Sequence, residues 1–281
     1  MRERRFIQCD VFANVLMKGN GLAVVVDGEG LSEQTMQDFA SWICQPETTF
    51  ILSASNPEAD YKVRIFTPSH ELRFAGHPTL GSCAAWLHAG GRPKVLGTVV
   101  QECGIGNVII DMGGALPGFV APPTRVDPMP SEHRDNLLAV LKIAGPSVLN
   151  SAVLDNGSVW YALELESAAA ILAVNAADVT GLPGLGIGLL GVSLLGADTQ
   201  FEIRMLSDRT ARYEDPITGA LNAAMAVWLA TQGRLTGPAV IAQGRKVGRC
   251  GRIHLLPDLS VPERILVAGQ TYILVDGTVR L

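Results

Sequence analysis

Apolar and charged residues alternate in two similar stretches of the chain. Residues 61–66 read Tyr-Lys-Val-Arg-Ile-Phe, and residues 201–206 read Phe-Glu-Ile-Arg-Met-Leu, at an offset of 140 positions. Alternation with a period of two predicts strands that have one buried face. The pattern therefore indicates that the second half of the chain repeats the first.

The residues that follow these two strands also recur. The motif x-Pro-x-x-Gly occupies 77–81 and again 215–219, an offset of 138, and each copy opens an alanine-rich segment that ends in Trp-Leu and then Gly-Arg. At those ends the offset has become 142, and the same offset relates Gln101 to Gln243. Because four residues make about one helical turn, we expect the second helix to be one turn longer than the first.

The alanine-rich segments predict two central helices. His77 and Asp215 stand at the expected cap positions, and each is followed by a proline at the first helical position, where the missing N–H costs nothing. Residues 220–230 are nearly all apolar or small, so we expect this helix to be enclosed by the strands of its own domain. Residues 32–43 predict a third, amphipathic helix with Ser32 as its cap.

The two copies define the expected domains. Residues 118–130 are rich in proline and lack periodicity, which places the domain change within or soon after them. We expect domains at residues 1–125 and 126–281, with the last strand as a candidate to cross back to the first domain. The predicted fold class is α+β, with two pseudo-symmetric domains that each wrap a mixed sheet around a central helix.

Composition and charge exclude several classes of function. Only 17% of the 281 residues are charged and the formal net charge is −5, whereas nucleic-acid binding selects for basic patches. The five cysteines are scattered without ligand spacing, so we expect no metal site, and a reducing cytoplasm fits. Residues 179–197 are uncharged, but glycines and Pro183 interrupt them, so no membrane span is expected. Small molecules are the expected partners.

Residues 186–191 match the dinucleotide fingerprint GxGxxG. The fingerprint binds a pyrophosphate only where a strand precedes it and a helix opens at its end. Here Gly-Leu-Pro-Gly precedes it, and the short apolar run Val-Ser-Leu-Leu-Gly, which resembles a strand, follows. We therefore expect a glycine-rich turn into a buried strand and no nucleotide cofactor.

The starts of the two buried helices are candidate anion sites, because free N–H groups and the helix dipole favour negative charge. His77 and Asp215 would supply acid–base groups at these starts. Glu47, at the threshold of an apolar strand, is a third candidate general acid or base. Structural alternatives stay open at this point: His77 and Asp215 as helix caps, and Glu47 as a solvated loop residue.

Several segments, in their order along the chain, resemble the PhzF family of phenazine-biosynthesis-type isomerases. The resemblance spans nearly the whole chain, and the part around His77 is long and specific. The segments that carry it are residues 19–25, 46–50, 65–68, 74–81, 214–219, 243–244, 248–249 and 267–270.

This resemblance implies the diaminopimelate-epimerase fold and an isomerase that uses no cofactor or metal, acts on a small carboxylate substrate and works as a cytoplasmic homodimer. Carried over by position, Glu47 would move a proton between two carbons of the substrate, while His77 and Asp215 would hydrogen-bond the substrate or assist the transfer. The positions implied for substrate binding are Asn20, Gly76, Pro78, Thr79, Gly219 and Ala220.

The sequence departs from the family pattern at two places in the expected site. Ala220 stands where the family commonly has serine, and Cys44-Gln45-Pro46 replaces the frequent Asn-Leu-Ser. Both departures disfavour the phenazine precursor itself as substrate. Cys83 lies more than a turn inside its helix, which disfavours a two-thiol racemase. The alternatives are a catalytically idle small-anion-binding protein of the same fold, and a racemase or lyase begun by the same proton abstraction.

Overall fold

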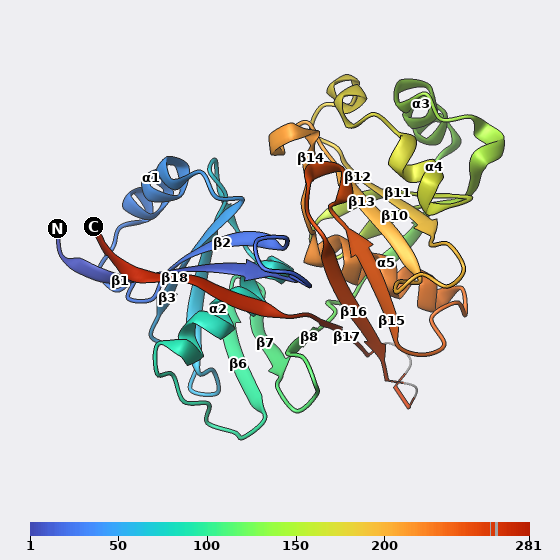
Figure 1. Ribbon diagram of the computed structural model, residues 1–281. Helices are drawn as coiled ribbons and strands as arrows, with labels where there is room; N and C mark the ends of the chain where they lie inside the picture. Colours follow the sequence, from blue (N-terminus) through green and yellow to red (C-terminus); the bar gives the residue numbers. More distant parts are fainter. Residues whose placement is uncertain (259, 262–263) are drawn as a thin grey trace. The chain divides into compact units, whose positions relative to one another are not determined.

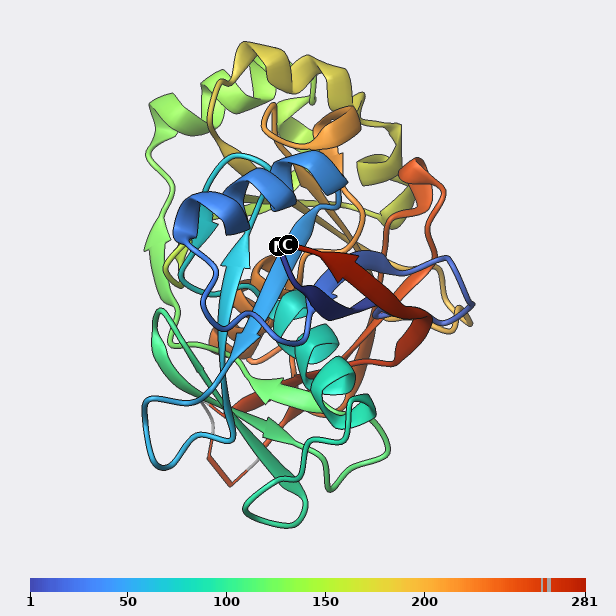
Figure 2. The same ribbon diagram turned by 90° about the vertical axis from the view of Figure 1, so that its left-hand side faces the viewer.

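The computed structural model describes residues 1–258, 260–261 and 264–281. The chain divides into two units, which we call the first unit (Met1–Val120 with Ala268–Leu281) and the second unit (Ala121–Val267). The C-terminal strand β18 (Thr271–Arg280) belongs to the first unit, where it pairs antiparallel with β1 (Glu3–Val11). Arg2 and Leu281 exchange backbone hydrogen bonds of 2.7 and 3.1 Å, so the two ends of the chain lie side by side (Figure 2).

The first unit contains a mixed sheet. Two of its neighbouring pairs, β2 with β3 and β4 with β6, are parallel, and the other pairs are antiparallel. The two-residue strand β5 (Glu71–Leu72) pairs with β4. In hydrogen-bonded order the sheet consists of β18, β1, β2 (Asn20–Val25), β3 (Glu47–Leu52), β4 (Tyr61–Phe66), β6 (Thr98–Cys103), β7 (Gly106–Asp111) and β8 (Gly118–Val120).

The second unit repeats this order and these directions. Its parallel pairs are β11 with β12 and β13 with β15, and the two-residue strand β14 (Glu214–Asp215) pairs with β13 as β5 does with β4. The strands are β9 (Arg125–Pro128), β10 (Val148–Asp155), β11 (Val159–Leu165), β12 (Gly186–Val192), β13 (Phe201–Leu206), β15 (Ala239–Gln243) and β16 (Gly251–Pro257), with β17 (Ile265–Ala268) following.

Each unit has one central helix, α2 (Gly76–His88) in the first and α5 (Gly219–Thr231) in the second. Helix α2 contacts β1, β2, β3, β6, β8 and β18, so the sheet curves around it (Figure 1). A Cβ on Gly81 would lie 2.4 Å from the Leu22 side chain, which shows how closely β2 approaches the helix. Nine of the 13 residues of α5 are buried. The predicted α+β fold, with a mixed sheet around a central helix in each repeat, is confirmed.

Two details of the predicted repeat are wrong. Both central helices have 13 residues, so the second is not one turn longer. They start at Gly76 and Gly219, and this offset of 143 makes Ala220, not Asp215, the equivalent of His77. The extra residues lie instead in the connection from β13 to β14, residues 207–213, which is longer than the 67–70 connection in the first unit.

The predicted cap residues are also corrected. The residues that precede the two helices are Ala75 and Thr218, and neither makes a side-chain cap hydrogen bond. His77 is the second residue of α2, and Asp215 lies in β14, where it pairs with Met205. The shared x-Pro-x-x-Gly pattern is misleading because its proline lies inside the first turn of α2 but precedes α5 by three positions.

Shorter helices cover the faces of the sheets that point away from α2 and α5. Helix α1 (Glu33–Ile43) begins after Ser32, whose Oγ accepts from the Thr35 amide as predicted, and packs Met36 and Phe39 against the first sheet. On the second unit, α3 (Ser131–Leu141), α4 (Ala168–Ala173) and the 3-10 helix η2 (Ala176–Gly181) pack over β11 and β12. No helix within the described residues combines the length and the apolar character that crossing a membrane requires.

The GxGxxG segment is part of a strand. Residues 186–191 form most of β12, and a Cβ on Gly188 would lie 2.5 Å from Met225 of α5, so this glycine allows the helix to pack on the strand. The run that follows, expected to be a strand, is instead a turn with Leu194 and Leu195 exposed. The glycines thus serve close packing between strand and helix.

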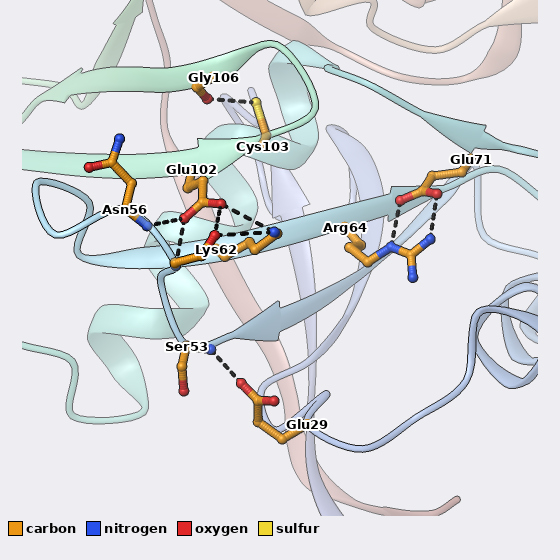
Figure 3. A network of polar contacts seen from close by, with 10 residues as sticks. Glu29, Ser53, Asn56, Lys62, Arg64, Glu71, Glu102, Cys103 and Gly106 are labelled. Carbon is orange, nitrogen blue, oxygen red and sulfur yellow. Dashed lines mark hydrogen bonds and ion pairs between the residues drawn. The ribbon is translucent and has the colours of Figure 1, made fainter.

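One ion pair recurs in both units at equivalent strands. In the first unit, Arg64 of β4 pairs with Glu71 of β5 at 2.6 Å, and the side chains are 23% and 36% exposed (Figure 3). In the second unit, Arg204 of β13 pairs with Glu214 of β14 at 2.6 Å, and each side chain is 1% exposed. Arg204 also donates to the carbonyls of Ile171 and Val174, at 2.7 Å each, which ties β13 to the end of α4.

A polar network in the first unit holds the connection between β3 and β4 (Figure 3). The Glu102 carboxylate of β6 accepts the Ser55 hydroxyl and the backbone amides of Ser55 and Asn56, the latter two at 2.7 and 2.9 Å, and pairs with Lys62 at 3.1 Å. These donors, the Ser55 hydroxyl first, lower the pKa of Glu102 to about 2.

Candidate functional site

Three of the predicted site residues meet at one edge of the first unit. Asn20 begins β2, Glu47 begins β3, and His77 lies in the first turn of α2. Because β2 and β3 are parallel, both strands begin at the same edge of the sheet. His77 Nε2 lies 3.2 Å from Glu47 Oε2, and Asn20 Nδ2 lies 3.3 Å from His77 Nδ1.

The contact between Glu47 and His77 involves a neutral imidazole. His77 is buried, and desolvation lowers its pKa to about 3, with a hydrogen bond to the Gly21 backbone acting in the opposite direction. His77 Nε2 and Glu47 Oε2 are close, at 3.2 Å, but are not aligned as a hydrogen bond. His77 therefore lies against the Glu47 carboxylate without neutralising its charge.

Solvent reaches the two side chains unequally. The Glu47 side chain is 18% exposed, whereas that of His77 is 4% exposed. Beneath them, Ser82 of α2 donates to Thr49 of β3 at 2.9 Å, which fastens the helix to the strand two residues from Glu47. Glu47 is thus the group that a substrate can reach, and His77 is its fixed support.

The remaining first-unit candidates belong to the first turn of α2. Gly76, Pro78 and Thr79 are buried there, and no side chain caps this helix start. The Thr79 hydroxyl donates to the Ala75 carbonyl at 2.9 Å and accepts from Gln101 Nε2 at 3.0 Å. The Thr79 hydroxyl is therefore engaged in an internal network, while the helix start itself retains the geometry that favours an anion.

The second unit holds the other predicted residues around the start of α5. Asp215 Oδ2 accepts a hydrogen bond from the Thr218 hydroxyl, and Gly219 and Ala220 are the first two residues of the helix. The Ala220 carbonyl accepts from Asn156 Nδ2 at 2.8 Å. A Cβ on Gly244 would lie 2.6 Å from the Pro216 carbonyl oxygen, so a glycine at 244 lets β15 lie directly against the segment that carries Asp215.

Sequence reasoning missed the residues that hold Asp215 in place. Thr218, Asn222 and Gln243 form a buried hydrogen-bond network next to it, and Gln243 accepts from Asn222 Nδ2 at 2.7 Å. The recurrence of Gln101 and Gln243 at one offset was the signal available for part of this network. Among the residues that the structure describes, no group of three or more His, Cys, Asp or Glu side chains is arranged to hold a metal ion.

Comparison with known sequences places the chain among related proteins. The family model PhzC-PhzF, described as phenazine biosynthesis-like protein, matches residues 9–277. Antisense-enhancing sequence 1 of Schizosaccharomyces pombe is 30% identical over 299 residues, which covers 99% of either chain. Trans-2,3-dihydro-3-hydroxyanthranilate isomerase of Pseudomonas aeruginosa is 31% identical over 258 residues, which covers 89% of either chain.

Solved structures share the fold. The phenazine biosynthesis protein of the PhzF family from Bacillus anthracis gives a TM-score of 0.82 at 20% identity and covers 100% of both chains. A probable proline racemase from Agrobacterium radiobacter K84 gives a TM-score of 0.63 at 12% identity and covers 99% of this chain and 93% of the racemase. Both likenesses support the diaminopimelate-epimerase-like α+β fold.

The match to the family model extends over most of the chain and includes Asn20, Glu47, His77 and Asp215. Relatives in this family carry the name isomerase, which confirms the expected enzyme class. The chain belongs to the PhzC-PhzF family of phenazine biosynthesis-like proteins.

Proposed function

We propose that the protein is a cofactor-independent isomerase that moves a proton between two carbons of a small carboxylate substrate, with Glu47 as general acid and base. The observation that carries this proposal is the contact of the solvent-reachable Glu47 carboxylate with the buried, neutral His77 at the uncapped start of α2. A carboxylate held in place beside free helix amides supplies both a base and donors for developing negative charge.

The steps follow from these groups. The amides of Gly76 and His77 and the α2 dipole hold the carboxylate of the substrate, and the Glu47 carboxylate removes a proton from carbon. The protonated Glu47 then returns that proton to a different carbon of the same molecule. His77 stays neutral throughout and packs against the Glu47 carboxylate.

The repeat supports the use of one acid–base group. Thr48, the residue after Glu47, pairs with Phe66 at the end of β4. Ile187, the residue after Gly186, pairs with Leu206 at the end of the equivalent strand β13. Gly186 is therefore the counterpart of Glu47. Ala220 is likewise the counterpart of His77. Because the second unit offers no ionisable side chain at these positions, proton removal and return by one carboxyl group is favoured over a racemase with two bases.

Other features of the proposal rest on the resemblance to the family. Asp215, Gly219 and Ala220 contact the substrate, Asn20 supports His77, and the protein works as a homodimer in the cytoplasm. The five free cysteines support a reducing compartment. Size-exclusion chromatography with light scattering tests the dimer.

Isomerisation of candidate acids tests the proposal directly. The panel contains trans-2,3-dihydro-3-hydroxyanthranilate, named for the Pseudomonas aeruginosa relative, and other cyclic unsaturated amino and hydroxy acids. Each is incubated with wild type and Glu47→Gln in deuterated water, and product is followed by NMR. We expect isomerised product with wild type and a loss of rate of at least about 10³-fold with the variant.

Equal behaviour of the two proteins across the panel would count against Glu47 as the acid–base group. Binding of an acid by both proteins without turnover would favour the alternative of an idle small-anion-binding protein. Exchange or elimination without isomerised product would favour a racemase or a lyase begun by the same proton abstraction.

A further inference from the structure

Gln243 contacts the segment that carries Asp215 through both ends of its side-chain amide. It is the last residue of β15 and is fully buried. Its Oε1 accepts from the Thr218 amide at 3.0 Å and from Asn222 Nδ2 at 2.7 Å. Its Nε2 donates to the Asp215 carbonyl at 3.3 Å and to the Thr218 hydroxyl at 3.1 Å.

Backbone groups determine which end of the Gln243 amide is nitrogen. The Thr218 N–H can only donate, and the Asp215 carbonyl can only accept, so the amide oxygen and nitrogen cannot be exchanged. Asn222 is fixed in the same way, because its Nδ2 donates to the Thr218 carbonyl at 2.9 Å. The Gln243 NH₂ group therefore faces the Thr218 hydroxyl oxygen.

This arrangement sets the direction of the Thr218 hydroxyl. Since the oxygen accepts from Gln243, its own hydrogen is directed to Asp215 Oδ2, which it contacts. A threonine that precedes a helix usually accepts from an amide of the first turn, but Thr218 makes no such bond. Thr218 consequently holds the carboxylate of Asp215 and leaves the start of α5 uncapped.

We infer that Gln243 is a positioning residue that acts through Thr218 to hold the Asp215 carboxylate as a hydrogen-bond acceptor for an amino or hydroxyl group of the substrate. The inference rests on the proposed function, because Asp215 belongs to the proposed site.

In the first unit, a glutamine also donates to a threonine hydroxyl, but the threonine donates to a different kind of acceptor. Gln101 Nε2 donates to the Thr79 hydroxyl at 3.0 Å, and Gln101 Oε1 accepts from the Tyr61 hydroxyl at 2.9 Å. The Thr79 hydrogen goes to the Ala75 carbonyl at 2.9 Å. The glutamine directs a threonine hydrogen in both units, but only Gln243 directs it to an acidic side chain.

Neutron diffraction from a deuterium-exchanged crystal tests the arrangement without any assay. We expect deuterium on Thr218 Oγ directed to Asp215 Oδ2, and one deuterium of Gln243 Nε2 directed to Thr218. A Thr218 deuterium directed to Gln243, or one bound to Asp215, would overturn the inference.

Kinetics with the acids of the isomerisation panel test the positioning role. We expect Thr218→Val and Gln243→Leu each to raise KM by about tenfold for acids with an amino or hydroxyl donor, with little change for acids that lack one. Thr218→Ser, which keeps the hydroxyl, restores the wild-type KM. Since both substitutions break one network, the double variant resembles either single variant.

Tyr61→Phe is the matched control, because it removes a buried hydrogen bond to Gln101 in the first unit and should leave KM unchanged. Equal KM increases for all acids, additive effects, or no difference from Tyr61→Phe would each overturn the inference. If wild type converts no acid of the panel, the proposed function fails, whereas the neutron map still decides the hydrogen-bond arrangement around Gln243.

Discussion

The two units place one ion pair in opposite surroundings. Arg64 and Glu71 are partly exposed, and Arg64 also contacts Glu33 of α1 at 2.7 Å. Arg204 and Glu214 are almost fully buried at the equivalent strands. The equivalent Arg–Glu ion pair is thus a surface contact in the first unit and a buried contact beside Asp215 in the second.

The starts of the central helices differ in a similar way. In the first unit, Glu47 and His77 give this region acid–base groups, whereas Gly186 and Ala220 stand at the equivalent positions of the second unit. The second unit instead has the network of Thr218, Asn222 and Gln243. At these equivalent positions, one repeat therefore has two titratable side chains and the other has none.

The largest expected effect tests the buried ion pair. Arg204→Ala leaves Glu214 buried without its partner and removes the donor to the Ile171 and Val174 carbonyls. We expect the free energy of unfolding to fall by about 3–5 kcal/mol. Urea unfolding followed by circular dichroism measures the change. A loss as small as that of Arg64→Ala would contradict the distinction between the two pairs.

The next effect concerns the helix start of the first unit. His77→Ala removes the group that contacts Glu47 and leaves the carboxylate without its support. We expect kcat/KM to fall by about 10²-fold, or about 2.7 kcal/mol. The isomerisation assay measures the rate, and thermal unfolding checks that the variant is folded. A variant that keeps more than half of the wild-type rate would remove His77 from the proposed mechanism.

Lowering the pH should decrease the stability of the first unit around Glu102. Its pKa is lowered from 4.5 to about 2 in the folded protein, so its stabilising contribution is complete above about pH 4.5 and is lost as the pH falls from there through about 2. Allowing for solvent screening, we expect about 1–2 kcal/mol. Hydrogen exchange measured between pH 5 and pH 3 should show earlier opening of residues 53–60.

Glu102→Gln provides the control for this effect, because the variant cannot titrate and its 53–60 segment should lose this pH dependence. Ala242 pairs with β13 as Glu102 pairs with β4, so the second unit has no carboxylate at the equivalent position. Equal acid sensitivity of residues 53–60 in wild type and Glu102→Gln would show that Glu102 is not the cause.

The smallest expected effect is that of the exposed ion pair. Arg64→Ala removes contacts to Glu71 and Glu33 that water can largely replace. We expect a loss of about 0–1 kcal/mol in the free energy of unfolding. The same urea titration used for Arg204→Ala measures it. A loss above about 2 kcal/mol would mean that exposure does not separate the two pairs.

The sequence predicted the repeated fold because periodicity reports which faces of strands and helices are buried. It misplaced the register of the central helices because one short proline motif occurs at two different positions relative to the helix start. The three-residue difference lies in a connection where Arg212 and Tyr213 adopt left-handed conformations. Neither arginine nor tyrosine is a residue type that predicts such a conformation.

For the candidate site, residue type and resemblance selected Glu47, His77 and Asn20, which the structure brings together. The partners of Asp215 were not predicted, because the roles of Thr218 and Gln243 depend on contacts across 25 residues of chain. A neutral imidazole at His77 was equally beyond reach, since it follows from the tertiary burial of the side chain.

The pairing of β18 with β1 has a consequence for biosynthesis. The second unit is one continuous segment, Ala121–Val267, whereas the first needs Ala268–Leu281 to complete its sheet. On the ribosome, every strand up to β17 is therefore synthesised before the first unit receives its edge strand. The half of the chain that is made first can therefore complete its sheet only after the second unit has been synthesised.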